Sequence, residues 1–361
     1  MNRASGREAV VVGTGLIGTS IGLALTRAGW TVHLRDRLLS HARVAESLGA
    51  GTSEPAISRD VELVVVAVPP RVLGDAISHA LANYPRATVT DVGSVKAGVL
   101  DALWDTQVGL ERYVGSHPMA GSQHSGPLAA RADLFADRTW VITPHRRSAP
   151  ESVEVVHDLV GACGAREIVM DVGEHDAAVA TVSHLPQLMS TLTAGALTGV
   201  PASHLALAGP GLRDVTRIAA SDPQLWEQIL NANQAAVLER LRAVQTELDA
   251  VIAALAAGGS GSAGEALRAS LERGVEGTRK IPGKHGRAPA TYGQVVVEIP
   301  DTPGALAKLF ADVGAAGVNV EDIAIEHDQV RQVGYLALSV TPDQVGALDR
   351  TMRDGGWVVQ P

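Results

Sequence analysis

A glycine-rich turn near the N-terminus is the feature that most restricts what this chain can fold into. Gly13, Gly15 and Gly18 stand in the spacing G-x-G-x-x-G, after the apolar run 9–13 and before a helix-like segment. The first glycine permits a tight turn, the second lets the backbone approach a pyrophosphate, and the third allows close packing of helix on strand. This context predicts a Rossmann-type α/β fold that binds a dinucleotide.

An acidic residue, Asp36, indicates which dinucleotide is bound. It ends the apolar run 31–35 and follows Gly18 by 18 residues, where a carboxylate would bind the adenosine ribose hydroxyls of NAD. Arg35 and Arg37 flank it and leave NADP open, because a guanidinium there can bind a 2′-phosphate. We favour the interpretation of both arginines as solvated surface charges. The remaining residues of the expected cofactor site are Leu16, Ile17, Val68 and Pro69.

Short β-branched runs alternate with helix-like segments from Glu8 to about Met170. This alternation is typical of βαβ units, and it predicts a doubly wound parallel sheet. Each run ends near Gly, Pro, Ser or a charge, as buried strands do. We expect strands at 9–13, 31–35, 63–68, 88–92, 113–116, 139–143 and 166–169.

After Asp171 the pattern becomes helical. Ala and Leu recur at helical spacing over 174–199, 201–219 and 223–257, which predicts an all-helical unit. The part 225–255 could form a single helix of more than seven turns. Such a helix buries its apolar stripe against neighbours or a second subunit, so we expect a homodimer.

A third unit follows the Gly/Ser-rich stretch 258–262 and a basic, Pro/Gly-rich linker at 279–290. Its expected order of elements, βαββαβ, is ferredoxin-like. The strands are placed at 293–299, 319–326, 332–340 and 357–360, and the helices at 304–313 and 342–352. The expected domains are 1–172 for the dinucleotide, 173–290 for dimerisation and substrate, and 291–361 for regulation.

Composition narrows the class of function. The 361 residues suit two or three domains, and 46% hydrophobic residues supply their cores. A net charge of −9 disfavours nucleic-acid and anionic-membrane partners and favours a small-molecule enzyme. The single cysteine, Cys163, suits a reducing compartment, and no run suits a signal peptide or membrane span, so we expect a cytoplasmic protein.

The strand 113–116 is followed by His117, at the end of the sheet where ligands of open α/β folds bind. Histidine exchanges protons near neutral pH, but a single loop histidine is more often a hydrogen-bonded structural residue. No metal site is expected. Glu174, His175 and Asp176 are consecutive, so they would point in different directions on a helix, and we interpret them as helix-start charges.

Four segments together resemble the prephenate dehydrogenase family: DVGSVK, GSHPMAGSQHSG, EHDAAVATVSHLPQ and GLRDVTRIAASDPQLW. They occur in the family's order and span two predicted domains. The resemblance implies NAD-dependent oxidative decarboxylation of prephenate to 4-hydroxyphenylpyruvate, a step of tyrosine biosynthesis. Arogenate, the amino counterpart of prephenate, is the alternative substrate.

The same resemblance implies roles for individual residues. His117 is similar to the catalytic histidine that takes the proton of the ring 4-hydroxyl, and Ser94 to the serine near that hydroxyl. Lys96 is a weaker candidate, either a solvated helix-start residue or an anion contact. Arg217 resembles the arginine that binds a substrate carboxylate, with Arg213 as second choice; for both, a surface ion pair is the alternative.

One block departs from the family pattern. The family commonly has Ser-His-Leu-Pro-His, whereas here His184 is followed by Gln187 in the last position. Both are expected to bind substrate from one helix face, with Pro186 kinking the helix between them. Because the glutamine is neutral, the choice between prephenate and arogenate as substrate stays open, and we favour prephenate. His124 either borders the site or is solvated.

The segment IPDTPGALAKLFADVGAAGVNVEDI resembles the small regulatory ACT domain. The resemblance implies that an amino acid, most economically tyrosine, binds as effector at Asp301, Pro303, Gly304 and Asn319. The alternative is a module that only strengthens the dimer. Two rival functions remain: a non-catalytic amino-acid or redox-sensing regulator, and hydride transfer on another hydroxy acid.

Overall fold

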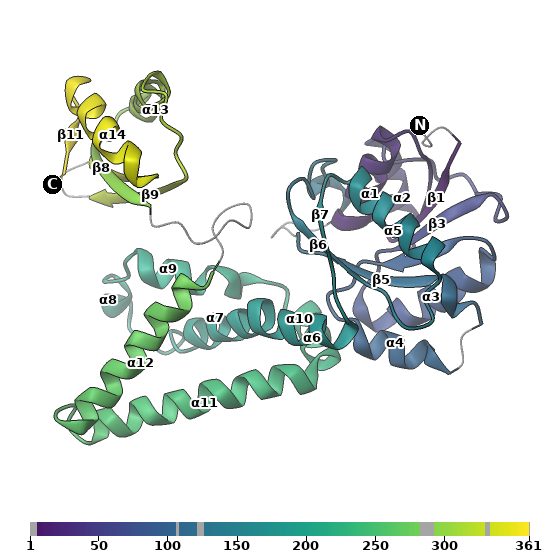
Figure 1. Cartoon of the computed structure of the whole chain (residues 1–361), viewed down its shortest axis with the longest axis horizontal. Helices are drawn as coiled ribbons and strands as arrows, with labels where there is room; N and C mark the ends of the chain where they lie inside the picture. The colour runs from purple at the N-terminus through teal and green to yellow at the C-terminus, as the bar shows by residue number, and fades with distance from the viewer. Residues whose placement is uncertain (1–5, 106–107, 121–125, 282–291, 329–332, 361) are drawn as a thin grey trace. The chain divides into compact units, whose positions relative to one another are not determined.

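The structure is a computed structural model that describes residues 6–105, 108–120, 126–281, 292–328 and 333–360. The chain divides into two compact units, Met1–Thr246 and Glu247–Pro361, which are described separately (Figure 1). Within the described ranges, none of the helices is long and apolar enough to cross a membrane.

The first unit is built on a sheet with the strand order β2-β1-β3-β4-β5-β6-β7. Every strand that the sequence predicts there is present, within a few residues of its expected bounds. The chain reverses its strand order between β1 and β3, and the carboxyl ends of strands at such a point form a ligand-binding crevice. The strands are β1 Glu8–Val12, β2 Thr31–Arg35, β3 Val61–Val66, β4 Thr88–Asp91, β5 Tyr113–Pro118, β6 Thr139–Thr143 and β7 Arg166–Val169.

The expectation of a parallel sheet is wrong at one edge. β1 to β5 are parallel, but β6 runs antiparallel to β5, with Gly115 opposite Thr143, and β7 follows β6 in parallel. The described part of the β5–β6 connection holds only a short 3₁₀ turn, Pro127–Ala129, and lacks the long crossover that a parallel return needs. As the edge strand, β7 is also exposed along its length, not buried as predicted.

Helices cover both faces of this sheet (Figure 1). Alternate strand residues point to opposite faces, so each face gains its own apolar core. One core includes side chains from α1 Leu16–Arg27 and α5 Pro150–Ala162. The other includes α3 Leu73–Asn83 and α4 Ala97–Trp104. The short helix α2, Leu39–Ser47, follows β2. The Rossmann-like architecture is therefore confirmed.

The rest of the first unit is helical, as expected, but its helices are shorter than the sequence predicts. The helical segment predicted over 201–219 consists of α8, α9 and a 3₁₀ turn. Asp222 caps α10 by accepting a hydrogen bond from Gln224 N at 2.8 Å. The elements are α6 Val172–Val179, a π turn Ala180–His184, α7 Leu185–Gly195, α8 Ala202–Leu205, α9 Pro210–Thr216, a 3₁₀ turn Arg217–Ala220, α10 Pro223–Ala232 and α11 Gln234–Ala256.

The helix containing Pro186 passes through a π turn at Ala180–His184 and continues as α7, with Pro186 in the first turn of α7. One expectation about these helices is wrong. The long helix predicted over 225–255 is interrupted at Asn233, between α10 and α11. The Asn233 side chain is buried and donates to the carbonyl oxygen of Asp176 at 2.8 Å, so the interruption has a tertiary cause.

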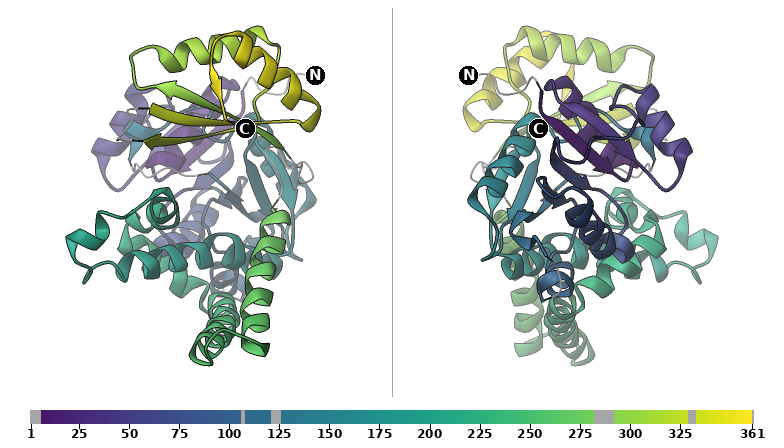
Figure 2. Two further views of the ribbon diagram at one scale, coloured as in Figure 1. Left: turned by 90° about the vertical axis from the view of Figure 1, so that its left-hand side faces the viewer. Right: turned by 90° about the vertical axis from the view of Figure 1, so that its right-hand side faces the viewer.

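The second unit contains a helix that the sequence analysis missed, α12 Ser262–Arg279, together with a four-stranded antiparallel sheet ordered β11-β8-β10-β9. The elements around this sheet follow the expected βαββαβ order, and both helices pack on one face of it (Figure 2). The predicted linker lies mostly outside the described residues. The elements are β8 Gly293–Pro300, α13 Ala305–Ala315, β9 Asp322–Asp328, β10 Val333–Val340, α14 Pro342–Asp354 and β11 Val358–Val359.

Replacing Asn233 by alanine should destabilise the first unit. The change leaves the carbonyl of Asp176 without this donor, and an unsatisfied buried polar group costs about 1–3 kcal/mol. Urea denaturation should therefore show a lower free energy of unfolding. Asn83→Ala is the matched control, because the Asn83 amide also donates to a backbone carbonyl, that of His79, but is exposed. Equal effects of the two changes would contradict the prediction.

Candidate active site

The glycine turn after β1 fits a dinucleotide. Gly13 has a φ of 95°, and a Cβ there would lie 2.2 Å from the carbonyl oxygen of Ala67. A Cβ on Gly18 would lie 1.8 Å from the carbonyl oxygen of Gly13, so the start of α1 closes directly onto the turn. Gly15 faces open space, with no atom within 4 Å of its Cβ position. The turn is therefore closed against the sheet and open on the side where a pyrophosphate would lie.

Asp36 is joined to this turn. One carboxylate oxygen accepts hydrogen bonds from the backbone N and Oγ1 of Thr14, at 2.7 and 3.0 Å, and the other accepts from the backbone N of Leu38 at 2.8 Å. Arg35 donates to backbone carbonyls, including those of Ser53 and Glu54, so its guanidinium is already engaged. The site fits the ribose hydroxyls of NAD better than a 2′-phosphate.

The other expected cofactor residues lie around the same turn. Leu16 is buried and Ile17 half-buried at the start of α1. Val68 follows β3, with Cγ1 3.1 Å from the Cβ position of Gly13, and Pro69 beside it is exposed. The structure thus brings the end of β3 against the glycine turn.

His117 lies on β5 and is half-buried. Its Nδ1 is 3.0 Å from Nε2 of His175, and Nδ1 of His175 is 2.8 Å from a carboxylate oxygen of Asp176. Burial holds the pKa of His117 well below its usual value, and the positive charge of Lys96 lowers the pKa further. The histidine is therefore neutral near pH 7 and able to accept a proton.

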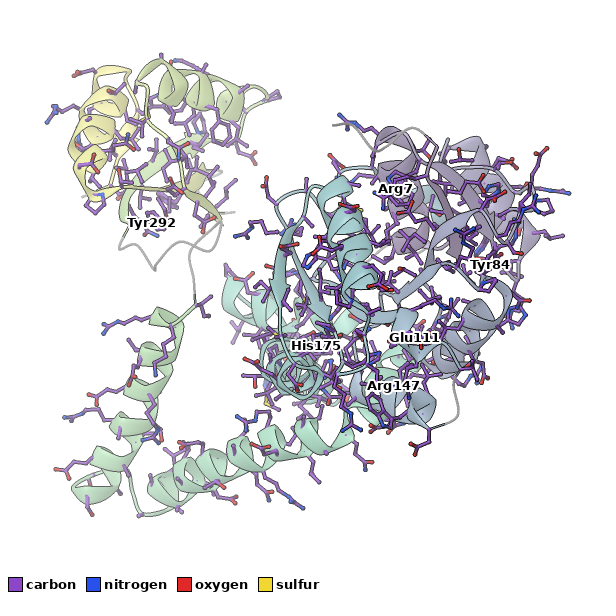
Figure 3. The ribbon with its side chains drawn as sticks, turned by 45° about the vertical axis from the view of Figure 1, so that its right-hand side comes forward. Arg7, Tyr84, Glu111, Arg147, His175 and Tyr292 are labelled. Atoms are coloured by element: carbon purple, nitrogen blue, oxygen red, sulfur yellow. The ribbon has the colours of Figure 1, made fainter. Side chains whose placement is uncertain are left out.

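The interpretation of His175 and Asp176 as helix-start charges is wrong. Both are buried in α6, where the helical segment meets the sheet (Figure 3). The carboxylate of Asp176 accepts hydrogen bonds from the backbone N of Lys96 at 2.9 Å and of Ala97 at 2.8 Å. The available signal was helical spacing, because Asp176 and the apolar Val179 and Ala180 lie on one buried face.

Lys96 lies at the start of α4 as expected but is fully buried, so the expectation of a solvated residue is wrong. Its Nζ donates to the carboxylate of Asp91 and, at 2.8 Å, to the carbonyl oxygen of Ser116. Asp91 also accepts from the hydroxyl of Tyr113 at 2.8 Å. Ser94 is half-buried in the same turn and lines a cavity of about 370 Å³, with Ala232 of α10 on its wall.

His184 and Gln187 share a buried face, as expected from their spacing. Nδ1 of His184 lies 3.2 Å from the amide nitrogen of Asn233, and its ring meets Trp226 edge-on at 6.1 Å. Burial lowers the pKa of His184. Gln187 donates to the carbonyl oxygen of Ile218 at 3.0 Å, which attaches the 3₁₀ turn 217–220 to α7.

Arg213 and Arg217 are exposed on the segment after α8. In the part of the chain that the structure describes, neither guanidinium has a hydrogen-bonding partner or contacts His117. His124 lies outside the described residues. The geometry therefore brings His117, His175, Asp176 and Lys96 together, with Ser94 on the same turn as Lys96, and leaves the two arginines apart.

Comparison with known proteins identifies the chain's relatives. The family profile described as prephenate dehydrogenase, nucleotide-binding domain, matches residues 21–169, and that described as prephenate dehydrogenase, dimerization domain, matches residues 171–271. A Streptomyces niveus protein named as a probable prephenate dehydrogenase is 36% identical, over 97% of this chain and 99% of its own. The chain belongs to the prephenate dehydrogenase family.

Solved structures agree with this membership. Prephenate dehydrogenase of Aquifex aeolicus, in complex with hydroxyphenyl propionate and NAD+, is 25% identical with a TM-score of 0.66, covering 75% of this chain and 98% of that one. Synechocystis arogenate dehydrogenase is 26% identical with a TM-score of 0.63, covering 76% and 99%. Neither family profile extends over the βαββαβ module at 293–359.

Replacing Asp36 by asparagine should weaken NAD binding in this family member. The change removes the charge that would hold the ribose hydroxyls, and a hydrogen bond to a charged group contributes about 1.5–3 kcal/mol, or roughly ten- to hundredfold in affinity. The KM for NAD should rise, and the preference for NAD over NADP should fall. Asp60→Asn, in an exposed turn, is the control. An unchanged KM for NAD would show that Asp36 does not bind the ribose.

Proposed function

We propose that this chain catalyses the NAD-dependent oxidative decarboxylation of prephenate to 4-hydroxyphenylpyruvate. The observation that carries the proposal is a neutral, half-buried His117 on β5, facing a second histidine that itself contacts a carboxylate, in a member of the prephenate dehydrogenase family. Relatives named as prephenate dehydrogenases, and a structure holding hydroxyphenyl propionate and NAD+, support the substrate and the cofactor.

The residues of the chain divide the chemistry as follows. NAD, when bound, supplies the nicotinamide that accepts a hydride from ring carbon 4. His117 accepts the proton of the hydroxyl on that carbon, and Ser94 hydrogen-bonds the same hydroxyl. The carbon–carboxylate bond then breaks to release CO2, and its electron pair makes the ring aromatic. The phenolate oxygen takes back the proton from His117, which gives 4-hydroxyphenylpyruvate and restores the neutral histidine. No covalent nucleophile is needed, so position and charge balance carry the catalysis.

The substrate's other groups require cations and hydrogen bonds. Arg217 binds a substrate carboxylate, with Arg213 as the second candidate, because a planar guanidinium suits a carboxylate. Both are exposed and therefore available to a ligand. Gln187 and His184 line the side-chain end. The segment 183–187 holds no acidic residue for the ammonium of arogenate, which favours prephenate, although the similarity to an arogenate dehydrogenase makes arogenate the substrate to compare.

The helical part supports a homodimer. Several large apolar side chains of α11 and α12 are exposed, and a surface of this kind marks an interface. They are Leu238, Leu248, Ile252, Leu255, Leu271 and Val275. The proposed domains are a cofactor-binding domain at 1–172, a dimerisation and substrate domain at 173–290, and a regulatory domain at 291–361.

The C-terminal module is proposed to be ACT-like and to bind tyrosine as a feedback effector. A cavity of about 570 Å³ in this module includes Pro303 and Gly304 in its wall. Lys308 and Trp357 line it too, with Nζ of Lys308 5.4 Å from the Trp357 ring, so a cation and an aromatic face are available to an aromatic amino acid. Two other expected effector residues, Asp301 and Asn319, are exposed and lie outside the wall of this cavity.

The variant His117→Asn tests the proposed activity. Asparagine can still donate from the position of Nδ1 but offers no base at the position of Nε2, so turnover should fall by about 10²- to 10⁴-fold while NAD binding persists. Formation of NADH, CO2 and 4-hydroxyphenylpyruvate should be stoichiometric in the wild type, with prephenate turned over faster than arogenate. His79→Asn, on an exposed face of α3, is the control. Turnover within a few-fold of wild type would refute the role of His117.

The variant Lys308→Ala tests the effector site. Tyrosine should inhibit the wild type, and the variant should need roughly ten- to hundredfold more tyrosine for half-inhibition, because one charge-assisted hydrogen bond is lost. Turnover without tyrosine should stay unchanged. Lys280→Ala, an exposed lysine directly after α12, is the control. If tyrosine leaves wild-type turnover unaltered, the module is not a tyrosine sensor.

A further inference from the structure

We infer that the buried pair of Asp176 and His175 sets the tautomer of His117 and thereby makes Nε2 of His117 the nitrogen that accepts the substrate proton. The inference rests on the proposed function, since it explains how the base of that reaction is prepared. Asp176 and His175 are positioning residues: they act on substrate only through His117. Three observations lead to this assignment.

The first observation is the environment of Asp176. Its carboxylate accepts hydrogen bonds from the backbone N of Lys96 and of Ala97, and contacts Nδ1 of His175 at 2.8 Å. These hydrogen bonds hold the pKa of Asp176 below its usual value in spite of its burial, so it is ionised. An ionised carboxylate can only accept hydrogen bonds. The proton in the contact therefore belongs to Nδ1 of His175.

The second observation is the contact between the two rings. When the ring proton of His175 lies on Nδ1, its Nε2 keeps a lone pair. This lone pair faces Nδ1 of His117 at 3.0 Å, with the rings edge to face at 75°. Nδ1 of His117 must then be the donor. The neutral His117 ring consequently keeps its lone pair on Nε2, which has no hydrogen-bonding partner among the described residues.

The third observation is the set of charges around His117. Lys96 is the charged group that lowers the pKa of His117 most, but its Nζ donates to Asp91 and to the carbonyl oxygen of Ser116. It therefore acts on His117 through its positive charge and does not donate a proton to it. His184 also faces this cluster from the π turn, and burial lowers its pKa. Tyr113 donates its hydroxyl to Asp91. Asp176 is thus the anion whose charge reaches His117 through an imidazole.

This arrangement acts in both protonation states of His117. Before the reaction, Lys96 and burial disfavour the imidazolium, so the ring is free to act as a base. When Nε2 accepts the substrate proton, the new imidazolium donates from Nδ1 to His175, whose own proton is held by Asp176. The same logic explains why a carboxylate behind a catalytic histidine in serine proteases affects turnover mainly through the tautomer and orientation of the ring.

Two substitutions at His175 separate positioning from packing. Leucine removes the acceptor that faces His117, whereas the side-chain oxygen of glutamine can accept a hydrogen bond from a position close to that of Nε2. His175→Leu should lower kcat at least about tenfold with little change in KM, because a share of His117 would then carry its proton on Nε2. The acidic limb of the pH profile of kcat/KM should also move to lower pH. His175→Gln should restore most of the turnover and return the acidic limb close to its wild-type position.

A matched control is available in α5. His157 also pairs with a carboxylate, that of Glu167 at 2.7 Å, but lies outside the site. His157→Leu should leave kcat and the pH profile unchanged. If His175→Leu behaves like this control, the inference is wrong.

A second measurement is independent of turnover and of variant folding. ¹⁵N NMR of histidine-labelled wild-type protein, with the His117 signals assigned by their loss in His117→Asn, should show a protonated Nδ1 and an unprotonated Nε2. A proton on Nε2 of neutral His117 would overturn the inference. If the tautomer is as expected but prephenate is not turned over, the inference about the tautomer of His117 holds and the proposed function is wrong.

Discussion

The buried carboxylate of Asp176 is the interaction on which the site depends. Placing an unpaired carboxylate in a protein interior costs several kcal/mol, so its position is stable only if donors surround it. Two backbone N–H groups at the start of α4 and one imidazole supply them. The helical segment is therefore joined to the start of α4 through this carboxylate, and any shift of α6 relative to α4 would break both backbone hydrogen bonds at once. The turn that carries Ser94 and Lys96 is therefore held in place relative to His117.

A second buried charge, that of Lys96, stabilises the same part of the site. Lys96 has no access to water, and the Asp91 carboxylate and the carbonyl of Ser116 replace its hydration. Because Ser94 lies two residues before Lys96, the ion pair anchors the turn that carries this serine. Ser116 in turn precedes His117 on β5. Two motifs that are far apart in the sequence are thus held together by a lysine that has no direct contact with substrate in the proposed mechanism.

Local sequence signals were sufficient to predict the backbone elements that carry the site, but not the contacts among its buried side chains. The glycine turn, Asp36 and the strand positions follow from spacing and periodicity, which reflect backbone geometry within one βαβ unit. The reversal of β6 and the break at Asn233 depend on tertiary contacts, and neighbouring residues do not encode these. The contact of His175 with His117 was not predicted for the same reason: the two residues are 58 positions apart. A charged residue on an otherwise apolar helix face, as at Asp176, is the signal that could have identified it.

The arrangement of charged groups around residue 117 explains why a histidine suits this position. A base must be neutral before it takes a proton and stable afterwards, and one uniform environment cannot favour both states. Here the two demands are met from different directions. Lys96 and burial disfavour the imidazolium in the resting site, while Asp176 is coupled to the ring through the hydrogen bonds of His175. A carboxylate placed directly against His117 would instead raise its pKa and hold it protonated. The intervening imidazole therefore gives the ring its orientation and a remote counter-charge without removing its capacity to act as a base.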